Sequence, residues 1–188
     1  MRTARVKVAI AVAGAALLGG GAAAVAAGDG GERQELTGFE EVPALSTPGV
    51  GEFRADIGRG EIRYRLTFSN LESPATQAHI HFENETNTGP IVVFLCSNLG
   101  NGPAGTQACP AGGGTVTGTI RGADVGDGAA AQGLEAGQFD ELLRAIRAGA
   151  TYVNVHTEGR PSGEIRAQLG DDGHEHDHNG PGQGHDGG

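Results

Sequence analysis

The sequence has few aromatic and few basic residues, and its only long hydrophobic run lies at the beginning. It contains no tryptophan, two tyrosines and six phenylalanines, against 35 glycines in 188 residues. So few large side chains with so much glycine predict a modest core and many turns. Lysine and arginine number 13 against 23 aspartates and glutamates. A chain this acidic repels nucleic acid and anionic lipid, which excludes both as expected partners.

The first 27 residues have the pattern of a secretory signal. Three basic residues within the first seven positions precede the apolar run Val8–Leu18, and small residues follow up to Ala27. This order is typical of a cleaved signal, and the run is shorter than the 20 or so residues of a transmembrane helix. The alternative is an uncleaved membrane anchor. We predict a secreted protein, extracellular or periplasmic, with no stable membrane insertion after the signal is cleaved.

The remaining chain divides into three parts. We expect a linker at residues 28–34, one domain at residues 35–169 and a tail at residues 170–188. The central part is long enough to bury a single core. The tail is rich in glycine, aspartate and histidine and contains no apolar residue except one proline. It has nothing to bury, which predicts disorder.

Only two cysteines are present, Cys96 and Cys109. An even count in an exported chain favours a disulfide, which would close a loop without hydrophobic periodicity. A loop of this length predicts up to about 3 kcal/mol of stabilisation. The alternative is a pair of metal-binding thiolates. Their separation and the exported context favour a structural disulfide.

Alternating apolar residues predict β-strands. In EIRYRLTF at residues 61–68 every second residue is apolar, and FRADI at residues 53–57 repeats the pattern. The glycines between the two segments predict a turn, so this pair is expected to form an antiparallel hairpin. Six further segments are expected to be strands: Glu35–Val42, Gln77–Phe82, Ile91–Leu95, Thr115–Arg121, Thr151–Thr157 and Glu164–Leu169.

One helix is predicted at Gly137–Arg147. Phe139, Leu142, Leu143 and Ile146 have the spacing of one helical face, so the helix is expected to pack against the sheet. Many short strands with Gly, Pro and Asn between them predict a sandwich or a barrel.

Three histidines on two predicted strands form a candidate metal site. His79 and His81 are two residues apart and therefore share one face of their strand, and His156 lies on the other strand. If the strands are neighbours, the three imidazoles converge into a set that suits copper or zinc. The alternative is that they are half-buried polar residues, hydrogen-bonded to Asn154, Thr157 or backbone carbonyls.

Three blocks of the sequence resemble the CHRD (chordin) domain family: LTGFEEVPALSTPGVGEFRADI, AHIHFENETNTGPIVVFL and AGATYVNVHTEGRPSGEIRAQL. They occur in the family's order and cover residues 35–169. The resemblance implies an antiparallel β-sandwich, immunoglobulin-like or superoxide-dismutase-like, with one short helix before the last two strands. It implies no catalytic residues. Chordin is an extracellular antagonist of growth factors, and that partner does not carry over to a single-domain, bacterial-type member.

The histidine pattern is also similar to the copper ligands of Cu,Zn superoxide dismutases. This sequence departs from that pattern because no histidine lies between His81 and His156. It therefore has no candidate for a bridging ligand or a zinc subsite, which argues against dismutase activity and leaves a site with one metal ion.

The tail is a second candidate for metal binding. It contains His174, His176, His178 and His185, which we call the tail histidines, with acidic residues between the first three. Such a cluster suits zinc, nickel or copper, and a flexible segment can wrap around an ion. The alternative is a solvated tail that adds charge.

These observations support three hypotheses. The first is a non-enzymatic extracellular module that binds an unidentified protein or has a structural role. The second is a copper or zinc protein that uses the three strand histidines, with redox or hydrolytic activity. The third is metal scavenging by the tail histidines. Glu164 and Arg166 share a strand face, and we expect them to form a surface ion pair.

Overall fold

A computed structural model describes residues 31–170 of the chain. This part contains eight strands, one α-helix and three short 3-10 segments. The bounds are β1 (Glu32–Thr37), β2 (Val50–Ile57), β3 (Ile62–Ser69), β4 (Ala75–Phe82), β5 (Ile91–Ser97), β6 (Gly114–Ile120), α1 (Phe139–Arg147), β7 (Thr151–Thr157) and β8 (Ile165–Leu169). The 3-10 segments are Gly38–Glu40, Gly122–Asp124 and Ala130–Gln132.

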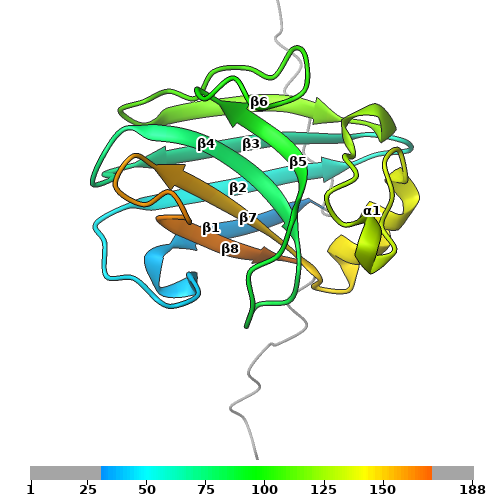
Figure 1. Cartoon of the computed structure of the whole chain (residues 1–188), viewed down its shortest axis with the longest axis horizontal. Coiled ribbons are helices and arrows are strands. Elements are labelled where there is room, and N and C mark those ends of the chain that lie inside the picture. Colours follow the sequence, from blue (N-terminus) through cyan, green and yellow to red (C-terminus); the bar gives the residue numbers. More distant parts are fainter. Residues whose placement is uncertain (1–30, 171–188) are drawn as a thin grey trace, which may run out of the picture.

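The strands form one curled antiparallel sheet in the order β5-β4-β7-β8-β1-β2-β3-β6. Figure 1 shows β5, β4, β7 and β8 in one layer, in front of a second layer made of β1, β2, β3 and β6. The two ends of the sheet approach each other, so the fold is a nearly closed barrel or sandwich. This arrangement, with one helix before the last two strands, confirms the predicted fold class.

The core lies between the two layers. Along β3, Ile62 and every second residue after it are buried and the residues between are exposed, as the alternation predicts. The helix α1 lies at one end of the sandwich in Figure 1 and buries residues such as Leu142 and Ile146. The predicted helix and hairpin are therefore confirmed, and their apolar faces close the same core.

A single side chain bridges the seam between the edge strands β5 and β6. The Nε2 group of Gln107 donates hydrogen bonds to the carbonyl of Leu95 on β5 (3.1 Å) and to that of Thr117 on β6 (3.0 Å). Gln107 belongs to the segment closed by the Cys96–Cys109 disulfide, whose sulfur atoms are 2.05 Å apart. The predicted disulfide is confirmed, and it holds the segment that closes the barrel.

The first strand differs from the prediction. It begins at Glu32, within the residues expected to be a linker, and it ends at Thr37 instead of continuing to Val42. Its polar residues show no apolar alternation, but Glu32 pairs with Ala55 on β2 and the pairing continues to Thr37. The chain then turns at Gly38, where a Cβ atom would lie 2.5 Å from a methyl group of Thr47, so only glycine fits.

Two of the predicted segments lie outside the described residues: the signal at 1–27 and the tail from residue 171, including the tail histidines. Gly170, expected to begin the tail, still belongs to the fold because its carbonyl accepts a hydrogen bond from Gln34. Within residues 31–170 no helix is long and apolar enough to span a bilayer.

Candidate metal centre

The strands β4 and β7 are neighbours, as the three-histidine hypothesis requires. They pair antiparallel, with Ile80 opposite Val153. Because side chains alternate along a strand, these two residues enter the core, and His79, His81 and His156 project from the other face of the same layer. The apolar alternation therefore fixes the direction of all three imidazoles.

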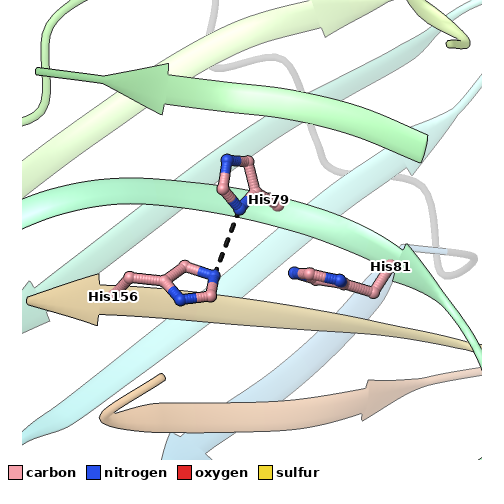
Figure 2. A group of neighbouring side chains, drawn as sticks. All are labelled: His79, His81 and His156. Carbon is pink, nitrogen blue, oxygen red and sulfur yellow. Dashed lines mark hydrogen bonds between the residues drawn. The ribbon is translucent and has the colours of Figure 1, made fainter. Parts of the chain in front are cut away.

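The three imidazoles converge. One ring nitrogen from each histidine lies within 4.8 Å of the other two. Figure 2 shows His79 and His81 on β4 and His156 on β7, with a hydrogen bond between His79 and His156. The Nδ1 atom of His79 is 3.1 Å from the Nε2 atom of His156. Two nitrogens at this spacing, each bound at 2.0–2.1 Å to one ion, would subtend about 100° at the ion.

Backbone carbonyls fix the tautomers of two rings. The Nδ1–H group of His81 donates to the carbonyl of Gly89 at 2.8 Å, and that of His156 donates to Pro161 at 3.0 Å. A carbonyl can only accept, so each Nδ1 atom carries the proton and each Nε2 atom keeps its lone pair. Metal-binding histidines typically donate their second ring nitrogen in this way. The segments that follow β4 and β7 thus orient two ligands.

Burial keeps all three rings neutral. His79 is fully buried, and His81 and His156 are 7% and 6% exposed. Burial, together with the neighbouring His156 and His81, lowers the pKa of His79 to about 2. Burial also lowers the pKa values of His81 and His156 to about 4. The neutral form is the one that binds metal ions, so at neutral pH none of the three rings has to lose its charge before binding.

His81 and His156 form hydrogen bonds to backbone carbonyls, as expected if the histidines are structural polar residues and bind no metal. They use only one nitrogen of each ring, and neither Asn154 nor Thr157 is a partner of these histidines. The Nε2 atoms of His79 and His81 are buried without any hydrogen-bond partner. An unpaired buried polar atom costs about 1–3 kcal/mol, and a purely structural role leaves this cost unexplained at His81, whose other nitrogen is already bound to Gly89.

Two residues that the sequence analysis did not assign to the site support His81. The ring of Tyr152 stacks on the His81 ring, with 4.7 Å between centroids and 1° between planes. The guanidinium of Arg166 lies 3.5 Å from the centre of the Tyr152 ring. The hydroxyl of Tyr152 also accepts a hydrogen bond from the backbone N–H of Gly89. The carbonyl of the same glycine accepts the hydrogen bond from His81. The available signal for Tyr152 was strand alternation, because it lies four residues before His156 and therefore on the same face of β7. Arg166 lies on β8 opposite Asn154 of that face, a pairing that the sequence did not show.

The expected surface pair of Glu164 and Arg166 is wrong. Both side chains are buried, at 0% and 1% exposure, and they bind different partners. Arg166 donates to the carbonyls of Asn84 and Asn87, whereas Glu164 accepts from Thr47, Thr157 and a backbone N–H. The face was expected to be solvated, but the connecting segments cover it.

The comparisons with known proteins give one match. The CHRD domain family matches residues 33–169. This region contains all eight strands, apart from the first residue of β1, and His79, His81 and His156. Neither the curated proteins nor the solved structures contain a match to this chain. The matched region is most of the chain and agrees with the resemblance seen in its three sequence blocks. The chain belongs to the CHRD domain family.

Proposed function

We propose that this protein is a metal-binding module in which His79, His81 and His156 hold one copper or zinc ion. The observation that carries the proposal is the convergence of one ring nitrogen from each of three buried histidines, with the Nε2 atom of His81 left without a hydrogen-bond partner. Imidazole nitrogen suits both metals. This arrangement favours metal binding over a purely protein-binding role.

Binding of an ion requires one proton to move. In the metal-free protein His156 Nε2 carries a lone pair, so the hydrogen bond at 3.1 Å is donated by His79 Nδ1. An ion between these two atoms takes the place of that proton, which moves to the other nitrogen of His79. His81 already has its free nitrogen unprotonated. The site is therefore ready to bind after the shift of a single proton.

We further propose that the protein is exported. The Cys96–Cys109 disulfide supports this, because disulfides persist in oxidising compartments and are rare in the cytosol. The predicted signal at residues 1–27 is consistent with the same destination. An exported protein meets copper and zinc outside the cell, where a site of buried imidazoles would retain an ion.

The test is elemental analysis of the full chain with the tail histidines changed to alanine, after exposure to copper or zinc and removal of free metal. We expect one ion per chain, and its loss in His81→Gln and His156→Gln, because each change removes one of three ligands. Arg65→Gln introduces the same residue at an exposed strand position and is expected to keep the ion.

Stability of each metal-free variant, measured by thermal unfolding with a chelator, separates loss of the site from loss of the fold. Absence of a stoichiometric ion in the tail-substituted chain would contradict the proposal. Retention of the parent's metal content in both histidine variants would also contradict it. If only the chain with intact tail histidines retained metal, the tail hypothesis would replace the strand site.

A further inference from the structure

A fourth polar side chain lies beside the three histidines. Asn154 is directly opposite His79 on the paired strands, and it precedes His156 by two residues on the same face of β7. Directly opposite residues have Cβ atoms about 4.5–5.5 Å apart, so the Asn154 side chain is next to that of His79. It is 2% exposed, and its Oδ1 atom is buried without a hydrogen-bond partner.

A buried carboxylate sets the orientation of this amide. The Nδ2 group of Asn154 donates to Oε1 of Glu41 at 2.8 Å, and Glu41 is 7% exposed. Because the Glu41 carboxylate accepts the hydrogen bond of the amide nitrogen, the amide oxygen remains free for another partner. Glu41 comes from the segment between β1 and β2, more than 100 residues earlier in the chain. A long-range contact therefore fixes which end of the amide is free.

A glycine packs over the same pair. A Cβ atom on Gly163 would lie 2.5 Å from Asn154 Nδ2, 2.6 Å from Glu41 Oε1 and 2.7 Å from Asn154 Oδ1. Real Cβ contacts are never this short, so any side chain at position 163 would displace the amide. Gly163 also has a φ angle of 130°, which glycine adopts readily and other residues rarely do. The backbone thus closes this side of the site against solvent.

We propose that the Oδ1 atom of Asn154 is the fourth ligand of the ion held by the three histidines, with Glu41 as the residue that positions it. This inference rests on the proposed metal-binding function. Amide oxygens serve as weak additional ligands in copper sites. Sites with a full set of protein ligands are structural, whereas catalytic sites keep one position open. The centre is therefore closed and retains its ion without turning over a substrate.

The experiment uses the full chain with the tail histidines changed to alanine, loaded with Cu(II) and titrated with azide. A closed centre gives no azide-to-copper absorption band. Asn154→Ala opens the fourth position, so azide binds and copper affinity falls by at least about tenfold, as for other supporting groups of metal sites. Asn154→Asp keeps an oxygen at the same place and is expected to exclude azide again. Asn101→Ala, at an exposed asparagine, is the matched control.

The positioning role of Glu41 is tested by comparing two variants. Glu41→Gln keeps an oxygen that accepts from Asn154, so it is expected to retain affinity and exclude azide. Glu41→Ala frees the amide and is expected to admit azide. A residue that only supported the fold would change the unfolding midpoint of the metal-free protein in both variants without this difference in azide binding.

The outcomes separate the two proposals. Absence of bound copper in the tail-substituted parent overturns the proposed function and this inference together. Bound copper with an azide band in the parent leaves the three-histidine site intact and overturns the closed centre, whether or not Asn154→Ala folds. Bound copper with the same affinity and azide response in Asn154→Ala and its parent also overturns the inference alone.

Discussion

At the scale of single residues, Arg166 is the largest side chain among the fully buried ones. Its guanidinium donates to the carbonyls of Asn87 (2.8 Å) and Asn84 (3.0 Å) and to the side chain of Gln168 (3.2 Å), and it covers the Tyr152 ring. Burial lowers its pKa from the ordinary value. A planar cation with several donors satisfies these acceptors together, which a single ammonium group cannot do.

We therefore predict that Arg166→Lys lowers the free energy of unfolding by about 2–3 kcal/mol, because buried carbonyls lose charged hydrogen bonds. Urea denaturation monitored by circular dichroism measures this loss. Arg65→Lys is the control, since Arg65 is exposed on β3 and should unfold like the parent. Equal midpoints for the two variants would show that the buried guanidinium contributes nothing beyond its charge.

At the scale of elements, the connecting segments form a cover over the polar face of β4, β7 and β8. Glu164, between β7 and β8, forms hydrogen bonds to two other connecting segments and to the end of β7. Its carboxylate accepts from Oγ1 of Thr47, from the backbone N–H of Glu72 and from Oγ1 of Thr157, each at 2.8 Å. The side chain is 0% exposed. One carboxylate thus satisfies donors from segments that are far apart in the sequence.

Glu164→Ala leaves those three donors without an acceptor, and we predict a loss of about 3 kcal/mol in the free energy of unfolding. Thermal unfolding of the metal-free protein measures it. Glu158→Ala changes an exposed glutamate at the same end of the sandwich and should leave the transition unchanged. A shift no larger than that of Glu158→Ala would mean that water replaces the carboxylate.

The elements themselves could be predicted because their apolar residues follow a period. Alternation predicted the hairpin of β2 and β3 and placed His79 and His81 on one face of β4, and helical spacing predicted α1. The cover could not be predicted in this way. Gly89, Pro161 and Glu41 reach the site from segments without periodicity, through hydrogen bonds that exist only once the strands are paired. The polar start of β1 was missed for a related reason, since pairing with β2 holds it.

At the scale of the whole molecule, the buried titratable groups predict how stability depends on pH in the presence of a chelator. The pKa values of His79, His81 and His156 are lowered from 6.5 to about 2, about 4 and about 4. As pH falls below about 6.5, the unfolded chain takes up protons that the folded protein excludes. The free energy of unfolding therefore decreases by up to about 1.4 kcal/mol per pH unit for each histidine.

Glu41 changes the pH dependence of stability in the opposite direction. Burial raises its pKa from 4.5 to about 7, so its contribution to stability is complete below pH 4.5 and is lost as pH rises through 7. Because three histidines outweigh one glutamate, we expect stability to level off above about pH 7 and to fall steeply towards pH 4. Urea denaturation at a series of pH values measures this, and His81→Gln should reduce the slope between about pH 5 and pH 6 by about half, because Glu41 offsets one of the three histidines. Constant stability between pH 6.5 and pH 5 would contradict neutral burial of these rings.

The seam between β5 and β6 determines how the molecule behaves towards other copies of itself. Gln107 reaches both edge strands only while the segment between Cys96 and Cys109 lies against them. If this segment moved away, β5 and β6 would lose the hydrogen bonds to Gln107 and expose backbone groups at both edges. Exposed strand edges favour pairing between chains. We therefore expect the disulfide to limit strand-mediated aggregation, in addition to removing loop entropy from the unfolded chain.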